Sequence, residues 1–238
     1  MFVLPRRNIA QRALNRATHR FGIKPFPVRF ECSLPEAGAE PDTVFNAVYE
    51  SNYWESNESK SGSGSELKDA AQYIPRLVQV IKDLGIESMF DAPCGDLNWM
   101  PQVIDQTGID YIGGDIAKDA VAIARSRRPD LEIRLFDICA DDFPCADLWH
   151  CRDTFFHLDF ANIRRALDKA KSAVIEYAAI TTHRAIYLKN LDIQTGGFRL
   201  LDLHRPPFSF PRALRYLRDY PSGQFPRYVG IWKISDLP

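Results

Sequence analysis

The stretch MFDAPCGDLNWM, Met89–Met100, contains the feature from which the rest of the chain can be interpreted. An apolar run leads into Asp91, a Pro-Cys-Gly turn follows, and Asp96 closes that turn. A turn that binds phosphate would not carry two acidic side chains, because both would repel the ligand. We therefore expect a ligand that presents a positive charge, hydroxyl groups, or both to this turn.

Strand-like and helix-like segments alternate on both sides of the turn. Strands are predicted at residues 88–92, 111–115, 133–137, 146–153 and 173–180, and helices at 67–84, 117–127, 161–171 and from about Trp99. This alternation predicts βαβ units, a mostly parallel sheet and right-handed crossovers. Residues 197–203 and 228–234 are also strand-like, and we expect them to close the sheet as an antiparallel hairpin. The predicted fold class is α/β, with a Rossmann-like doubly wound sheet.

Three predicted strands end in an aspartate: Asp91, Asp115 and Asp137. Their intervals are close to the ~20 residues that separate a glycine turn from a ribose-binding acid. In a doubly wound sheet, ligands bind beyond the carboxyl ends of the strands. There, Asp115 can accept hydrogen bonds from both ribose hydroxyls. Asp137 can accept from an adenine amino group while the N–H of Ile138 meets a ring nitrogen.

The turn itself narrows the choice of nucleotide. The G-x-G-x-x-G pattern of a pyrophosphate site is absent, and Asp96 would repel a pyrophosphate. Gly95 lets the backbone approach a ligand closely. Near Asp91 and Asp96 we expect a cationic group, such as an α-amino group or a sulfonium. These acids favour S-adenosylmethionine over NAD, although an aspartate at a strand end is also a common helix N-cap.

Four motifs in this order resemble class I S-adenosylmethionine-dependent methyltransferases: DAPCGD (91–96), GGDI (113–116), FDI (136–138) and CRDTFFHL (151–158). The resemblance covers roughly residues 50–235 and implies a seven-stranded sheet with an antiparallel last strand. It places the methionine part of the cofactor at the turn, the ribose at Asp115 and the adenine at Asp137. The candidate cofactor contacts in and directly after these motifs are Asp91, Cys94, Gly95, Asp96, Trp99, Asp115, Ile116, Asp137 and Ile138. The turn in this chain departs from the usual glycine-rich turn, because it has Pro93-Cys94-Gly95-Asp96 in place of a second glycine. This departure narrows the subfamily that the chain resembles.

Residues 31–66 are polar and turn-rich, and they end in a glycine-serine run, SGSGS, at 61–65. This run would be a flexible linker by composition. It directly precedes a helical pattern, where free backbone N–H groups suit a carboxylate. Ser61, Gly62 and Ser65 are therefore candidate cofactor contacts, with an ordinary connector as the alternative.

The candidate catalytic residues follow the fourth predicted strand, in CRDTFFHLD. Arg152 and Asp153 fall at its carboxyl edge, and His157 lies one helical turn further on. A hydroxyl acceptor must lose its proton, so His157, with an ordinary pKa of ~6.5, is our candidate base. Asp153 is predicted to orient it or to act as the base itself. The alternatives for His157 are packing beneath Phe155 and Phe156, or substrate binding.

The acceptor side is less explicit. A loop-like segment at 189–199 and the aromatic pair Phe208 and Phe210 suit a sugar-like or polyhydroxylated acceptor, and the aromatic pair equally suits the core. The leading hypothesis is O-methylation of a small-molecule or glycan hydroxyl. The alternatives are N-methylation of a small amine, a non-catalytic S-adenosylmethionine-binding module, and an NAD-dependent oxidoreductase. CRDT stands where an N-methyltransferase would often have a polar-Pro-Pro-aromatic signature.

Composition limits the partners. A formal net charge of −1 argues against nucleic acid, and there is no apolar run of transmembrane length. The five cysteines form no CxxC pair, which predicts reduced thiols in a cytoplasmic protein, and no spacing demands a metal. Residues 1–30 contain no acidic residue and are predicted as a basic arm before a single domain, 31–238. That arm suits organelle targeting, a peripheral membrane or partner contact, or a solvated helix. The sequence predicts no oligomeric state.

Overall fold

The centre of the fold is a seven-stranded sheet in the order β3-β2-β1-β4-β5-β7-β6. The computed structural model describes residues 38–184, 189–220 and 226–238, so the predicted basic arm lies outside the described residues. The strands are β1 (Ser88–Asp91), β2 (Asp110–Asp115), β3 (Glu132–Leu135), β4 (Ala146–Cys151), β5 (Ile175–His183), β6 (Arg215–Arg218) and β7 (Arg227–Lys233). The first five are parallel, and β7 is antiparallel to both β5 and β6. The predicted Rossmann-like fold with an antiparallel C-terminal hairpin is confirmed.

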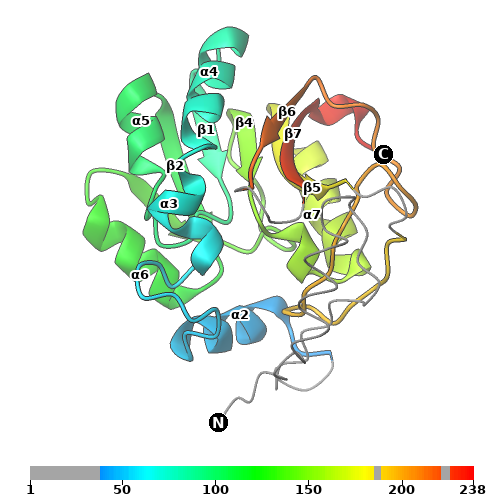
Figure 1. Cartoon of the computed structure of the whole chain (residues 1–238), viewed down its shortest axis with the longest axis horizontal. Coiled ribbons are helices and arrows are strands. Elements are labelled where there is room, and N and C mark those ends of the chain that lie inside the picture. Colours follow the sequence, from blue (N-terminus) through cyan, green and yellow to red (C-terminus); the bar gives the residue numbers. More distant parts are fainter. Residues whose placement is uncertain (1–37, 185–188, 221–225) are drawn as a thin grey trace.

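Helices cover both faces of this sheet (Figure 1). They are α2 (Pro41–Glu50), α3 (Leu67–Ala70), α4 (Ile74–Leu84), α5 (Pro101–Thr107), α6 (Lys118–Arg127) and α7 (Phe160–Ser172). The helix predicted over 67–84 is divided into α3 and α4. Pro75, at the start of α4, has no N–H to donate and its ring would clash with the carbonyl four residues earlier, which disfavours one continuous helix and suits the first turn of a new one.

The central strands are buried on both faces, which explains their nearly continuous apolar sequence. Side chains of a strand point alternately to opposite faces. Met89 and Leu148 pack with α4 and α5 in one cluster, whereas Phe90 and Trp149 pack with α7 in the other. The sheet is therefore held between two apolar layers. Its strand ends are the positions at which polar side chains can gather.

The predicted hairpin partner was placed in the wrong segment. Residues 197–203 form no strand, and β6 lies further along the chain. Their backbone groups bond to loops and side chains instead: the N–H of Arg199 donates to Phe156 O at 3.1 Å, and that of Leu203 donates to Thr182 Oγ1 at 3.0 Å. Leu201 and Leu203 are fully buried in the core. The strand-like alternation thus reflects an extended segment packed on the core.

An unpredicted helix, α2, covers the end of the molecule at which the site lies. It packs against α6, next to which it lies in Figure 1. Asn46 Oδ1 accepts a hydrogen bond from the N–H of Lys118 at 2.9 Å, at the first turn of α6. Phe45 and Tyr49, four residues apart on one face of α2, line the cavity described below. Among the described helices, none is long and apolar enough to cross a bilayer.

Candidate functional site

A cavity with about 850 Å³ of empty volume lies beyond the carboxyl ends of the first four strands. It brings together most of the predicted site residues, although they come from separate motifs. Its lining includes Asp91, Cys94, Gly95, Trp99, Asp115, Ile116, Asp137, Ile138, Arg152, Asp153 and His157, and from the N-terminal side Ser61 and Ser65. Asp96 and Gly62 are the predicted residues that it does not include. We call it the first cavity.

Asp91 ends β1 and is held by a buried polar network. His150 Nδ1 lies 2.6 Å from Asp91 Oδ1, and the Tyr111 hydroxyl donates to Asp91 Oδ2 at 2.7 Å. Tyr73 OH in turn lies 2.9 Å from His150 Nε2. Burial, followed by the charge of Asp91, raises the pKa of Tyr111 well above its ordinary value, so Tyr111 stays a donor. The carboxylate is therefore fixed in one orientation beside the cavity.

Asp115 ends β2, and each of its oxygens accepts one backbone hydrogen bond. The N–H of Gly95 donates to Oδ2 and that of Ala117 to Oδ1, both at 2.9 Å. A carboxylate oxygen has capacity for more than one donor, so both oxygens can still accept from a ligand hydroxyl. Burial raises the pKa of Asp115 to about 6. The ionised and protonated forms therefore exchange within an accessible pH range.

Helix capping does not explain these strand-end acids. The N-cap residues of α5 and α6 are Met100 and Ala117, so neither Asp91 nor Asp115 occupies such a position. Asp137 Oδ1 accepts from the N–H of Cys139 at 2.7 Å in the turn after β3. Burial raises the pKa of Asp137. Asp115 and Asp137 therefore each accept a hydrogen bond from a nearby backbone N–H and also line the cavity.

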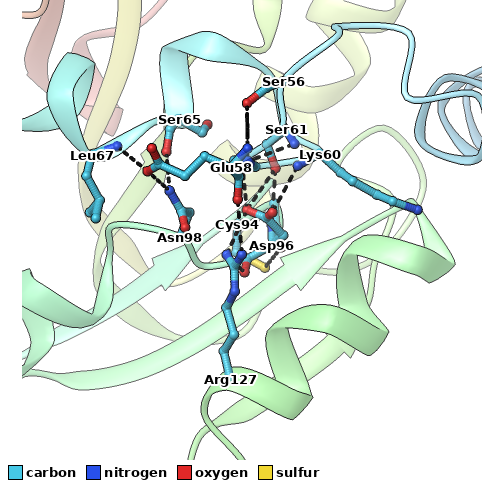
Figure 2. A network of polar contacts seen from close by, with 12 residues as sticks. Ser56, Glu58, Lys60, Ser61, Ser65, Leu67, Cys94, Asp96, Asn98 and Arg127 are labelled. Carbon is cyan, nitrogen blue, oxygen red and sulfur yellow. Dashed lines mark hydrogen bonds and ion pairs between the residues drawn. The ribbon is translucent and has the colours of Figure 1, made fainter.

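Asp96 was predicted to lie beside the ligand, but it does not line the first cavity. Its side chain points to the loop at residues 59–61 instead. Its carboxylate accepts from Ser59 Oγ at 2.8 Å and from the N–H of Lys60 at 3.1 Å, as part of the network in Figure 2. Gly95 has a related role. A Cβ on Gly95, whose φ is +59°, would lie 2.4 Å from Ser61 Oγ. The glycine thus makes room for the preceding loop, whereas the sequence suggested that it makes room for a ligand.

His157 is packed among aromatic rings and oriented by a backbone carbonyl. Its ring centroid lies 5.6 Å from that of Trp54, 4.6 Å from Phe156 and 5.7 Å from Phe198. His157 Nδ1 lies 2.7 Å from Gly197 O. A carbonyl only accepts, so Nδ1 carries the proton and Nε2 of the neutral ring is the basic nitrogen. Burial lowers the pKa of His157 to about 4.

Asp153 does not orient His157, which corrects one of the predicted roles. Arg227 Nη1 lies 2.9 Å and Arg152 Nη1 3.6 Å from Asp153 Oδ2. Burial alone would raise the pKa of Asp153, but these two arginines outweigh it and hold the pKa below its ordinary value. Arg152 also makes two 2.9 Å bonds to Asp219. The two arginines and two acids form a charge-balanced network between the two cavities, in which Arg152 and Asp219 are buried and Asp153 and Arg227 are partly exposed.

A second cavity, with about 1110 Å³ of empty volume, adjoins the first. Trp54, Ser61, Asp153 and His157 line both. The rest of its wall is aromatic and polar, comprising Tyr53, Glu55, Gly62, Ser63, Gly64, Phe156, Gly196, Gly197, Phe198 and Arg227. The predicted loop at 189–199 thus contributes its last residues. Phe208 and Phe210 are buried in the core instead.

Tyr49 and Trp54 are not identified from the sequence, because they lie in the polar, turn-rich segment 31–66. The signal was there: Val44 and Val48 repeat the helical spacing of Phe45 and Tyr49, and Pro41 suits the first turn of a helix.

Within the described residues, no group of three or more His, Cys, Asp or Glu side chains is arranged to hold a metal ion.

Comparison with known proteins identifies the fold alone. No family model and no curated protein matches the chain. Magnesium protoporphyrin IX methyltransferase from Synechocystis PCC 6803, solved with bound S-adenosylmethionine, is 13% identical over 82% of this chain and 98% of that chain, with a TM-score of 0.56. The methyltransferase domain of bacterial CtHen1 is 14% identical over 69% of this chain and 98% of that chain, with a TM-score of 0.53. The chain therefore has the Rossmann-like fold of these methyltransferases.

Proposed function

We propose that the protein is an S-adenosylmethionine-dependent methyltransferase that methylates a hydroxyl group of a small molecule or glycan. The observation that supports this most strongly is the pair of adjoining cavities that share His157. One cavity would hold the cofactor and the other the acceptor. We further propose that residues 31–238 form one methyltransferase domain and that residues 1–30 are an appended arm.

The residues of the first cavity fit S-adenosylmethionine. Asp115 keeps acceptor capacity for two ribose hydroxyls, because only one backbone N–H bonds to each oxygen. Asp91 supplies a fixed negative charge beside the turn, which suits an α-amino group. Apolar side chains of Phe136, Ile138 and Leu158 provide a surface for an adenine ring. A dinucleotide would place a pyrophosphate among these acids, which is unfavourable.

When bound, the cofactor would supply an electrophilic methyl group, and the protein's own task would be to position the acceptor. Two reactants held in line in one site need far less activation free energy than two free reactants. Gly197 holds His157 with Nε2 as its basic nitrogen. That nitrogen can accept the hydroxyl proton of an acceptor in the second cavity.

The low pKa of His157 affects when the proton would move. A base with a pKa of about 4 is too weak to deprotonate a free hydroxyl before reaction. The hydroxyl becomes much more acidic as its oxygen forms a bond to the methyl carbon, so the proton can pass to Nε2 late in the transfer. We therefore assign His157 as an orienting acceptor first and a proton acceptor second.

The second cavity suits an acceptor ring with one apolar face and polar edges. Trp54 and Phe198 offer ring faces, while Ser63 and the glycine backbone offer hydrogen-bonding groups. An amine acceptor is the alternative, because Glu55 together with Tyr53 and Trp54 can attract a cation. N-methylation therefore remains the competing reaction at the same site.

Turnover on a mixed acceptor set tests this proposal. Monosaccharides, polyhydroxylated aromatics and primary amines would be incubated with radiolabelled S-adenosylmethionine, and the methylated atom would be identified by mass spectrometry. Transfer to a hydroxyl supports the proposal, and transfer to an amine nitrogen replaces it with N-methylation. Cofactor binding without transfer to any acceptor class would favour a non-catalytic binding module.

A further inference from the structure

The glycine-serine segment forms the partition between the two cavities. We call residues 56–66 the partition loop. Ser61 lines both cavities, Ser65 lines the first, and Gly62, Ser63 and Gly64 line the second. The position of this loop thus determines the shape of both cavities at once. A flexible linker, as its composition suggests, could not perform that task.

Asp96 fixes the middle of the partition loop. Its carboxylate accepts from Ser59 Oγ at 2.8 Å, from the Lys60 N–H at 3.1 Å and from Ser61 Oγ at 3.4 Å. The N–H of Asp96 donates back to Ser61 Oγ at 3.1 Å. Figure 2 shows Lys60 and Ser61 beside Asp96. With the side chain 2% exposed, water offers little competition for these bonds.

Asn98 and Arg127 fix the two ends of the loop to the same turn. Asn98 Nδ2 donates to Glu58 Oε1 at 2.7 Å and to Ser65 O at 3.0 Å. Arg127, from α6, donates through Nη1 to Asp96 O at 2.7 Å and through Nη2 to Glu58 O at 3.4 Å. The loop is therefore tied at its start, middle and end to residues 96–98 (Figure 2).

The chemistry of these contacts requires a carboxylate at position 96. The groups that reach it from the loop are two hydroxyls and one backbone N–H, and all of them donate. An ionised carboxylate only accepts, so it satisfies all three together. An amide of the same size would present an NH₂ group to at least one of these donors. Removing one partner from a buried set leaves unsatisfied donors, which is costly.

We propose that Asp96 and Asn98 are positioning residues that hold the partition loop between the cofactor and acceptor cavities. Asp96 acts through Ser61 and the Lys60 backbone, and it does not contact the cofactor. The identity of the two occupants rests on the proposed function. The attachment of the loop to Asp96 rests on the contacts above.

Asp96→Asn tests the proposal, with Asp119→Asn as its matched control. Asp119 Oδ2 bonds to the Lys60 side chain at 3.2 Å on the exposed side of the same loop. Hydrogen exchange needs no ligand, and we expect the amides of Lys60 and Ser61 to exchange at least about tenfold faster in Asp96→Asn only. The amides of β1 and β4 should exchange as in the wild type, which a general loss of stability would not allow. Calorimetry should give about tenfold weaker S-adenosylmethionine binding for Asp96→Asn and unchanged binding for the control.

The outcomes separate this proposal from the proposed function. Unchanged exchange at Lys60 and Ser61, or faster exchange with unchanged cofactor affinity, would overturn the positioning role. A wild-type protein that binds no S-adenosylmethionine would overturn the proposed function, while the exchange data would still test the attachment of the loop. If Asp96→Asn does not fold, Asn98→Asp is the second variant, because it places a carboxylate against Glu58. It should speed exchange at the Ser65 end of the loop, and unchanged exchange there would contradict the proposal.

Discussion

The two cavities are built from different kinds of chain segment. The first lies where successive parallel strands end, so the sheet topology itself brings Asp91, Asp115 and Asp137 to one edge. The second is lined by segments that are distant in sequence: residues 53–55, 61–64 and 196–198, three residues that follow β4 (Asp153, Phe156 and His157), and Arg227 at the start of β7. A scaffold of this kind holds the common chemistry constant while the loops set the substrate. We therefore expect substitutions on the two sides to have separable effects.

The largest separation is expected from His157→Asn, whose amide nitrogen replaces Nδ1 as the donor to Gly197 O but which lacks a basic nitrogen. Turnover should fall roughly 10²–10⁴-fold, because no group then accepts the hydroxyl proton. Cofactor affinity should change far less than turnover, although His157 also lines the first cavity. Because burial lowers the pKa of His157 to about 4, the wild-type rate at saturating S-adenosylmethionine should be flat between about pH 6 and 8 and should fall only toward pH 4. Rate per folded molecule and thermal stability would be measured on the same samples, and a less stable variant with a normal rate would indicate a packing role.

On the cofactor side, Asp115→Ala should weaken S-adenosylmethionine binding by roughly 1.5–3 kcal/mol through the loss of charge-assisted hydrogen bonds. The control is Asp119→Ala, which removes an exposed carboxylate of the neighbouring helix α6. Calorimetric titration would compare the two. Normal binding by a folded Asp115→Ala protein would show that the ribose assignment is wrong.

Gly95→Ala and Gly85→Ala form a matched pair that tests the fit of the turn against the partition loop. Both glycines have positive φ, +59° and +64°, so alanine is strained at each by roughly 1–2 kcal/mol. A Cβ at Gly95 would additionally meet Ser61 Oγ at 2.4 Å, whereas nothing lies within 4 Å of one at Gly85. Gly95→Ala should therefore lower the free energy of unfolding more than Gly85→Ala, and it alone should weaken cofactor binding. Equal effects of the two substitutions on the free energy of unfolding and on cofactor binding would show that the close approach of residue 95 to Ser61 has no energetic consequence.

The smallest expected effect is the pH dependence of cofactor affinity. Ribose hydroxyls donate to the ionised Asp115, so binding should weaken as pH falls through the pKa of about 6 in the free site. The loss should approach tenfold per pH unit well below that value and should vanish in Asp115→Asn. Titrations between pH 5 and 8 would measure it, and an affinity that is flat in the wild type would contradict the role of Asp115.

Sequence periodicity was sufficient for the five parallel strands and for the residues at their ends, because topology alone sets where the last residue of such a strand lies. It failed for 197–203, where an extended loop packed on the core imitates a strand. It also failed for Asp96, because its partners Ser59 and Lys60 lie more than thirty residues earlier in the chain. The sequence predicted Asp153 as the residue that orients His157, whereas the structure has Gly197 in that role. This prediction failed for the same reason, because Gly197 is distant from His157 in the sequence. Contacts between loops depend on tertiary packing, which no local pattern encodes.

Calorimetric titration of the wild-type protein with S-adenosylmethionine, its demethylated product S-adenosylhomocysteine and NAD tests the central claim most directly. The acids at the ends of β1 and β2 predict one-to-one binding of the first two ligands at neutral pH and none of NAD. Binding of NAD in preference to S-adenosylmethionine would contradict the assignment of the first cavity as an S-adenosylmethionine site. So would the absence of binding of both S-adenosylmethionine and S-adenosylhomocysteine.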